Sequence, residues 1–252
     1  MEPAIVNPDP KYSRARLIEP TTLGYVHLSA RVNPRPTPFL PAPPERRRLL
    51  DRVEPLVRPL ERLVQVERVS VFDGAVIAPV ERMSGYLRQR AASIHPARFD
   101  VVVLIETTSP DTARALRDAP EYQALLDTLR DGSRDLHVML ARNAKRLGDV
   151  PRTRRGVYLF NYFVADDAEV ALELWDYLAG WYQVETGLDN SVLMAPLEGE
   201  PSDYVFVNYA HWDASLPTLF VRQMAKPTFR RYVLGNLEAN RVGSMPALYR
   251  PA

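Results

Sequence analysis

The chain has 252 residues, 46% of them hydrophobic, which is enough for one large domain or for two units of ordinary size. Its 32 basic and 31 acidic side chains leave a net charge of +1, unlike the concentrated positive charge of a nucleic-acid-binding protein. The chain has no cysteine, which excludes a disulfide framework, a thiolate nucleophile and a cysteine-ligated metal centre.

The beginning of the chain carries neither the basic region nor the apolar region of a signal peptide. No run approaches the roughly 18 apolar residues that a membrane span requires. We therefore expect a cytoplasmic protein that has no membrane partner.

The first half of the chain predicts elements in the order β-α-β-β-α-β. Its first helix carries apolar residues at helical spacing from Leu49 to Leu63, although Pro55 and Pro59 are expected to kink or break it. Long connections are expected in the Pro-rich stretch 33–44 and in segment 81–98. The predicted strands lie near 22–31, 66–78, 99–107 and 135–141, and the predicted helices near 45–64 and 110–130.

The basic segment from Arg142 to Arg155 is interpreted as a solvated linker to the second half, which again predicts β-α-β-β-α-β. The first helix of this half has Asp and Glu in its first turn, which favours helix formation. Its inward stripe is Val170, Leu174, Trp175, Leu178 and Tyr182. The predicted strands lie near 156–164, 190–197, 203–211 and 242–249, and the predicted helices near 167–184 and 216–238.

Four segments of the first half recur in the same order in the second half. Residues 24–29 resemble 157–162, residues 76–81 resemble 193–198, residues 100–105 resemble 204–209, and residues 120–122 resemble 227–229. The repeat predicts an α+β fold made by tandem duplication of ferredoxin-like βαββαβ units, the first at 15–148 and the second at 153–250.

The chain resembles the dimeric α+β barrel superfamily, which includes the antibiotic-biosynthesis monooxygenases. Three features carry this resemblance: the order of elements, the strand from Asp203 to Trp212, and the following helix with Pro227-Thr228-Phe229. The resemblance covers about residues 20–250. It implies that the two sheets close into an intrachain barrel, with pockets between sheet and helices. Fused members of this length include heme proteins similar to chlorite dismutase and ring-cleaving oxygenases of aromatic polyketide pathways.

This resemblance implies an oxygenase, of the monooxygenase type, that acts on an aromatic polyketide-like small molecule. The cofactor is expected to be absent or to be reduced flavin (FAD or FMN). Such chemistry needs an aromatic pocket, a group that takes or holds a phenolic proton, and donors for a developing oxyanion. A heme enzyme, a non-oxidative cyclase or isomerase and a non-catalytic ligand-binding barrel stay open as alternatives, and a homodimer is a reasonable expectation.

Candidate site residues come from polar and aromatic side chains inside predicted strands and helices. His27 shares one face of its strand with Tyr25 and Ser29, while Val26, Leu28 and Ala30 take the other face. Buried amides must find partners or line a cavity, which singles out Asn161 and Asn208. We predict proton handling by His27, Tyr158 and His211, and substrate binding by Tyr25, Asn161, Tyr162, Trp175, Asn208 and Trp212. Aromatic residues at this spacing are also typical of a hydrophobic core.

No metal site is predicted, because no two histidines share a ligand-like spacing. A heme would need an axial ligand from His27, His95, His137 or His211, and the ligand pattern of the chlorite dismutase relatives does not map onto these positions. A Gly-rich nucleotide loop is absent from the sequence, which disfavours a Rossmann-bound cofactor. Glu106 is expected to occupy nearly the position in the first half that His211 has in the second.

Overall fold

The computed structural model describes residues 2–34, 42–77, 84–151 and 155–252. The first half has the predicted order of strands and helices. Its elements are β1 (Gly24–Arg31), α1 (Pro44–Glu61), β2 (Val66–Ile77), α2 (Gly85–Gln89), β3 (Val101–Thr107), α3 (Pro110–Ala115), α4 (Pro120–Gly132) and β4 (Asp135–Gly148).

The second half repeats the order β-α-β-β-α-β, without an equivalent of α2 among the described residues. Its elements are β5 (Val157–Ala165), α5 (Ala168–Thr186), β6 (Ser191–Pro196), β7 (Phe206–Trp212), α6 (Leu216–Met224), the π-helix η3 (Phe229–Leu234), α7 (Gly235–Ala239) and β8 (Val242–Pro251). The N-cap Asp167 accepts hydrogen bonds from the first-turn amides of α5, and Gly187 ends this helix in the left-handed conformation.

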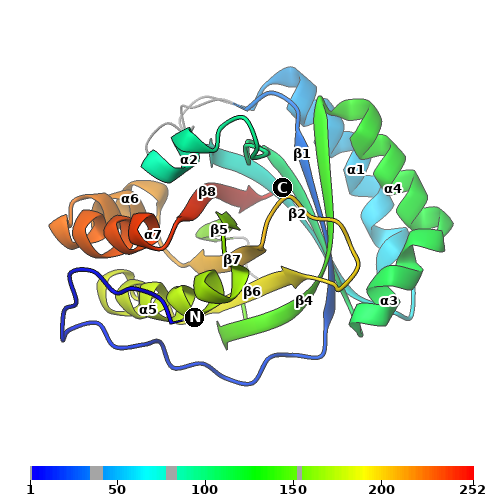
Figure 1. The fold of residues 1–252 in the computed structure, drawn as a ribbon. Coiled ribbons are helices and arrows are strands. Elements are labelled where there is room, and N and C mark those ends of the chain that lie inside the picture. The colour runs from blue at the N-terminus through cyan, green and yellow to red at the C-terminus, as the bar shows by residue number, and fades with distance from the viewer. Residues whose placement is uncertain (1, 35–41, 78–83, 152–154) are drawn as a thin grey trace.

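The eight strands form one closed antiparallel barrel in the order β1-β3-β2-β8-β5-β7-β6-β4. Each half contributes the ferredoxin-like order, β4-β1-β3-β2 or β8-β5-β7-β6, and the halves join where β2 pairs with β8 and where β4 pairs with β6. The helices α1, α3 and α4 lie on one side of the barrel and α5, α6 and α7 on the other (Figure 1). The topology confirms the predicted tandem α+β barrel.

The side chains pack in three layers because each sheet face is covered. The barrel interior holds an aromatic cluster with Tyr25, Phe160 and Tyr249. A second cluster fills the space between the first sheet and α1, α3 and α4. A third lies between the second sheet and α5, η3 and α7. It includes Leu174, Trp175 and Leu178 of the predicted stripe of α5, and Tyr182 packs against it. The alternation predicted for β1 is confirmed, since Tyr25 faces inward while Val26 and Leu28 face the helices.

The predicted linker is wrong for residues 142–148. These residues extend β4, and Arg142 and Arg146 pair with Ala195 and Val192 of β6. Their charged side chains do not form the apolar pattern by which a strand is predicted, although their backbone pairs with β6 and closes the barrel. The connection between the halves is therefore confined to the residues after Gly148.

Three helix predictions need adjustment. The helix α1 continues through Pro55 and Pro59 without a break. The helix expected near 110–130 is divided before Pro120, and the helix expected near 216–238 is divided into α6, η3 and α7. Proline at the first turn of α4 explains one division, because it cannot donate the hydrogen bond that a continuous helix requires.

The structure describes only part of one matched segment of the repeat and shifts another. Residues 78–81, part of the second matched segment, lie outside the described residues. The third match is shifted by one residue, because Leu104 pairs with His27 whereas the residue opposite Phe160 is Tyr209. With this correction, Glu106 and His211 hold equivalent positions, opposite Tyr25 and Tyr158.

No helix of the described residues is long and apolar enough to cross a membrane.

Candidate active site

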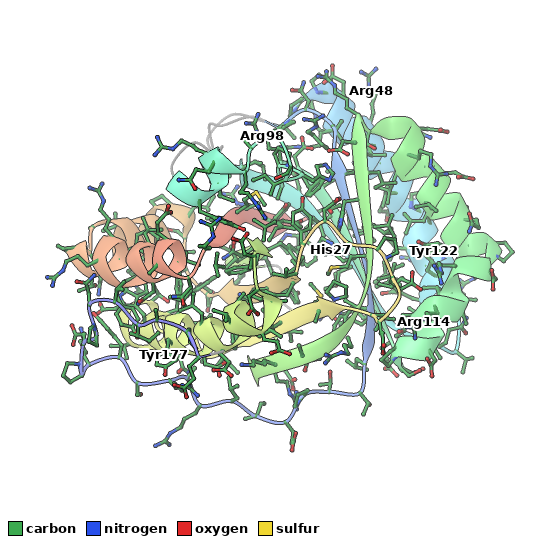
Figure 2. The ribbon with its side chains drawn as sticks, in the orientation of Figure 1. His27, Arg48, Arg98, Arg114, Tyr122 and Tyr177 are labelled. Atoms are coloured by element: carbon green, nitrogen blue, oxygen red, sulfur yellow. The ribbon has the colours of Figure 1, made fainter. Side chains whose placement is uncertain are left out.

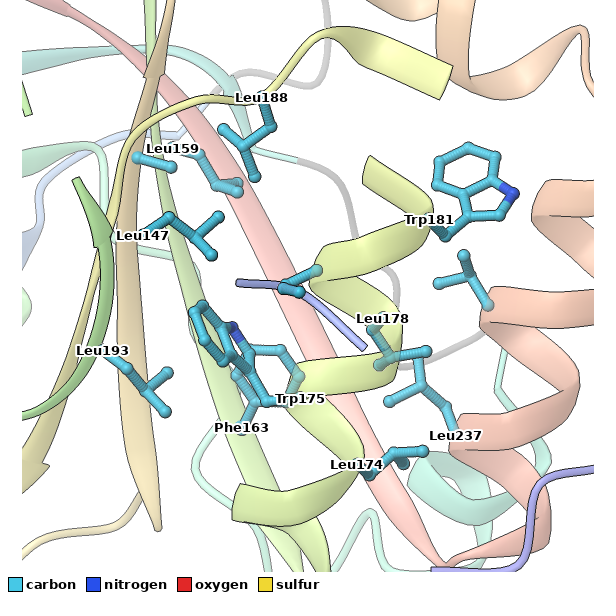
Figure 3. Packing of buried hydrophobic residues seen from close by; sticks show 14 of the residues in the cluster. Leu147, Leu159, Phe163, Leu174, Trp175, Leu178, Trp181, Leu188, Leu193 and Leu237 are labelled. Atoms are coloured by element: carbon cyan, nitrogen blue, oxygen red, sulfur yellow. The ribbon is translucent and has the colours of Figure 1, made fainter. Parts of the chain in front are cut away.

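A small cavity lies between α5 and the outer face of the second sheet. Figure 3 shows this region, where Trp175 of α5 projects toward the sheet beside Phe163. Leu159 of the sheet and Leu178 of α5 also line the cavity. Val233 of η3 and Leu237 of α7 complete the wall. The cavity measures ≈ 30 Å³, which is room for about one or two water molecules.

Two amide side chains enter this apolar cavity from the sheet. Asn161 of β5 and Asn208 of β7 are paired across the two strands and both line the cavity. The Oδ1 of Asn161 accepts a hydrogen bond from Ser244 Oγ at 2.9 Å, and the Oδ1 of Asn208 accepts one from Ser191 Oγ at 2.6 Å. Because both carbonyl oxygens are occupied, each amide keeps its Nδ2 donor for another partner. Within the described residues, neither Nδ2 has a hydrogen-bond partner.

Aromatic side chains form the remaining wall. Trp212 Nε1 donates to Thr186 Oγ1 at 3.0 Å, which fixes its indole ring against the C-terminal turn of α5. The Tyr182 hydroxyl accepts a hydrogen bond from Gln223 Nε2 at 3.0 Å. Burial raises the pKa of Tyr182, so its phenol stays protonated and can donate. Tyr182 is the one titratable side chain among the residues described as lining the cavity.

The predicted site residues divide into two sets on opposite faces of β5 and β7. Asn161, Trp175, Asn208 and Trp212 lie together in the cavity beneath α5. The other five belong to the barrel interior and its open end, so one pocket cannot hold both sets. These five are Tyr25, His27, Tyr158, Tyr162 and His211.

His27 lies in the middle of the barrel and is fully buried (Figure 2). Its ring contacts those of Phe160 and Tyr162, and its Nε2 is 3.5 Å from the Tyr162 hydroxyl. Its Nδ1 has no hydrogen-bond partner among the described residues. Burial, helped by His137, lowers the pKa of His27 to about 3, so the imidazole is neutral at neutral pH.

Tyr158 and His211 hold the backbone of the connection between the two halves. The Tyr158 hydroxyl donates to the carbonyl of Pro151 at 2.9 Å. His211 Nε2 lies 2.9 Å from the carbonyl of Arg155, which requires the tautomer that carries a proton on Nε2. His211 also lines a surface cavity with Asn190 and Asp213, separate from the one beneath α5. The contacts of both side chains therefore serve the connection of the halves.

Sequence reasoning missed the residues that orient the two amides. Ser191 and Ser244 lie on strands neighbouring those of Asn208 and Asn161, and their hydroxyls turn the amide nitrogens away from the sheet. Tyr182 was recognised as part of the apolar stripe of α5 but not as a hydrogen-bonding group. Its only sequence signal was the polar atom at the end of that stripe.

The histidine positions test whether heme fits the cavity. His27 and His137 lie within the barrel, and His95 lies between Asp135 and Asp203, 2.7 and 2.8 Å from its two ring nitrogens. None of these three, nor His211, lines the cavity beneath α5. A histidine-ligated heme therefore does not fit this cavity. Among the described residues, there is also no cluster of three or more histidine and acidic side chains suited to a metal ion.

Comparison with known proteins gives structural neighbours alone. No model of a protein family matches the chain. No curated protein matches it either. The crystal structure of an anthrone oxidase-like protein superposes with a TM-score of 0.63 and 14% identity, over 94% of each chain.

Two candidate monooxygenases show the same fold. The one from Fusobacterium nucleatum has a TM-score of 0.55 and 6% identity, over 93% of this chain and 94% of that chain. The one from Lactobacillus acidophilus has a TM-score of 0.50 and 9% identity, over 91% of this chain and 94% of that chain. At these identities the comparisons establish the fold of the protein.

Proposed function

We propose that the protein is an oxygenase that acts on an electron-rich aromatic small molecule in the cavity beneath α5. The observation that carries the proposal is the pair of amide nitrogens, of Asn161 and Asn208, that face an aromatic cavity with no partner among the described residues. Amide donors that face an apolar cavity are costly unless a ligand or water in the cavity accepts from them. The fold shared with an anthrone oxidase-like protein supports the choice of reaction class.

In the proposed mechanism, the described residues that line the cavity supply hydrogen-bond donors and aromatic walls, but no carboxylate or imidazole base. Asn161 and Asn208 donate to the oxygen of a phenol or enol and favour its anion, which Tyr182 can also contact. The described lining offers no base, so the proton of the phenol or enol passes to water, and the resulting anion passes an electron to O₂ to give a substrate radical and superoxide. These two combine to a peroxide, which takes up a proton and loses water. In the anthrone type of reaction, a ring CH₂ and O₂ become a ring carbonyl and water, so the organic molecule is oxidised and O₂ is reduced. The indole rings of Trp175 and Trp212 hold the aromatic substrate by stacking.

Substrate binding requires the cavity to open. A space of ≈ 30 Å³ is far smaller than the several hundred Å³ of a typical small-molecule site. The cavity lies between α5 and the sheet, Val233 of η3 and Leu237 of α7 form part of its wall, and a π-helix is often found at functional sites. We propose that α5 and η3 separate when the substrate enters.

The test is oxygen consumption by the purified protein with a hydroxylated anthrone, in the presence and absence of reduced flavin. We expect Asn161→Ala and Asn208→Ala each to lower kcat/KM by about 100-fold, the scale of losing one oxyanion donor. Asn33→Ala is the matched control, since Asn33 lies in the first half of the chain and does not line the cavity. Full activity in both cavity variants, with unchanged melting temperatures, would refute the site.

A spectrum of the protein purified without added cofactor separates the alternatives. Heme and flavin both absorb between roughly 300 and 700 nm. A featureless spectrum in this range is expected for an enzyme without a bound cofactor and is compatible with the proposal. A Soret band would redirect the search to heme, and a flavin band would favour the flavin-dependent reaction. Turnover that continues without O₂ would indicate the cyclase or isomerase instead.

A further inference from the structure

The N-terminal segment 2–18 connects two of the helices that line the proposed active cavity. The amide of Val6 donates to the Asn236 side chain on α7 at 2.7 Å. The amide of Ala15 donates to the carbonyl of Asp176 on α5 at 2.9 Å. The segment runs past both helices at the surface of the molecule (Figure 1). It therefore bridges the elements that have to move apart if the cavity is to open.

This segment can be released without disturbing the barrel. Residues 2–18 form no helix, and their one pairing with a strand is the isolated bridge between Ile18 and Arg146. The other contacts of the segment with the helices are separate hydrogen bonds and side-chain contacts. Irregular segments that are held in this way open locally at a lower free energy than the whole protein unfolds.

The carboxylate of Glu185 is the point where the segment and both helical walls meet. Glu185 lies in the last turn of α5, and its side chain is 4% exposed. Its Oε1 accepts a hydrogen bond from the Tyr12 hydroxyl at 2.7 Å and is paired with Lys11. Its Oε2 is paired with Lys226, which lies between α6 and η3. The ring of Tyr12 also packs on that of Tyr232 of η3, with the ring centroids 5.0 Å apart.

The bound segment favours the closed cavity for two reasons. Tyr12 contacts α5 through Glu185 and η3 through Tyr232, so the two helices cannot separate while both contacts are kept. Release of the segment would leave Glu185 with Lys226 as its one partner of the three. Removing partners from a buried carboxylate is costly, which favours the return of the segment.

We propose that the N-terminal segment 2–18 regulates entry to the cavity beneath α5, which is closed while the segment is bound and admits a substrate when the segment is released. This inference rests on the proposed function, because it takes that cavity as the substrate site. Release separates the helices but leaves the barrel strands in place. Asn161 and Asn208 belong to those strands, so the two amide donors keep their positions while the cavity opens.

The tryptophans of the chain allow opening to be measured without a substrate. Of the three tryptophans, Trp175 and Trp212 line the cavity and Trp181 does not. In a Trp181→Phe background, the tryptophan fluorescence therefore comes from the cavity wall alone. Acrylamide, a small neutral quencher, reaches these indole rings when the cavity opens. Hydrogen exchange of the Ala15 amide reports separately on release of the segment.

The double variant Lys11→Met, Tyr12→Phe weakens the hold of the segment on Glu185 and keeps the packing of the Tyr12 ring. We expect the Ala15 amide to exchange about tenfold faster or more, the scale of losing a hydrogen bond to a charged group. Acrylamide quenching should rise about twofold to threefold, because the opened state becomes more populated. Tyr12→Phe alone should give smaller changes in the same direction.

Tyr86→Phe is the matched control, since the Tyr86 hydroxyl also donates to a carboxylate, that of Asp166, at 2.9 Å. Tyr86 lies outside both the segment and the cavity lining, so this variant should leave quenching and Ala15 exchange unchanged. Lys226→Met removes the direct ion pair between α5 and the connection from α6 to η3, and it should raise quenching less than the double variant does.

Unchanged quenching in the double variant, or faster Ala15 exchange without a rise in quenching, would overturn the proposal. A rise in quenching confined to Lys226→Met would also overturn it, because the helices would then be held by their direct contact. Neither measurement uses a substrate. A failure here is therefore distinct from a failure of the proposed function, which would appear as full oxygen consumption in Asn161→Ala and Asn208→Ala.

Discussion

His27 shows how a single residue can suggest catalysis in the sequence and belong to the core in the structure. The alternation of Tyr25, His27 and Ser29 was read correctly as one face of a strand, but this face points into a packed barrel. Surrounded by aromatic rings, the imidazole stays neutral because burial, with a smaller contribution from His137, lowers its pKa. An imidazole in a solvated cleft can gain and lose a proton near neutral pH, whereas protonation of the buried His27 costs free energy because the charged ring is removed from water.

This burial predicts a pH dependence of stability. The pKa of His27 falls from 6.5 in the unfolded chain to about 3 in the folded chain, so between these values the unfolded chain binds more protons. Stability is therefore lost as the pH falls below about 6.5. We expect His27→Leu to reduce the slope of unfolding free energy against pH by up to about 1.4 kcal/mol per pH unit near pH 5.

Urea denaturation at a series of pH values measures this slope. Ser29→Ala is the control, because it alters a buried polar neighbour that does not titrate in this range. It should change the stability by a similar amount at every pH. An unchanged slope in His27→Leu would mean that water or a counter-ion reaches His27 in the folded protein.

At the scale of elements, the N-terminal segment 2–18 ties α5 to η3 and α7. The amide of Ala15 donates to the carbonyl of Asp176 on α5, and the amide of Val6 donates to the side chain of Asn236 on α7. Tyr12 donates to the buried carboxylate of Glu185, which is also paired with Lys11 and Lys226. Burial alone would raise the pKa of Glu185, but these hydrogen bonds outweigh it and lower the pKa to about 2. This segment therefore holds together the helices that surround the proposed active cavity.

Gly180 is the point of closest approach between this segment and α5. A Cβ atom at Gly180 would lie 1.9 Å from the carbonyl oxygen of Ser13, so the backbone of the segment must move away. We expect Gly180→Ala to lower the free energy of unfolding by about 1–3 kcal/mol and to speed tryptic cleavage after Lys11 and Arg14. Limited proteolysis followed by mass spectrometry gives the rate.

Gly235→Ala provides the matched control for this segment. A Cβ atom at Gly235 would meet Asn7 and Val6 at 3.7 Å, an ordinary contact, and alanine favours the helix. Its cleavage rate should equal that of the wild type. If Gly180→Ala were cleaved at the same rate as well, the segment would not depend on its close contact with α5.

At the scale of the whole molecule, the two halves depend on each other because they share the barrel interior. The interior cluster combines Tyr25 and Met139 of the first half with Phe160 and Tyr249 of the second. Each ferredoxin-like half therefore has two apolar sheet faces, one covered by its own helices and one covered by the other half. The two seams supply backbone pairing around this shared core.

We expect residues 153–252 expressed alone to self-associate or to bind a hydrophobic dye, because the inner face of the second sheet would be exposed. Light scattering measures the mass. Co-expression with residues 1–152 is the control, and it should restore a compact complex with the mass of the intact chain. A monomeric, cooperatively folding second half that binds no dye would contradict a shared core.

The sequence by itself determined the duplication, the order of strands and helices, and the inward stripe of α5, because these depend on local patterns of apolar residues. It also singled out Asn161 and Asn208, since an amide within an apolar strand must have a partner or a cavity. The tertiary structure alone decided which candidates meet. Side chains alternate across a strand, and the closed barrel placed one set in a packed interior and the other beneath α5. The pairings of β4 with β6 and of β2 with β8 likewise depend on contacts between distant segments. No local pattern of apolar residues predicts these pairings, because the end of β4 carries charged side chains and pairs through its backbone.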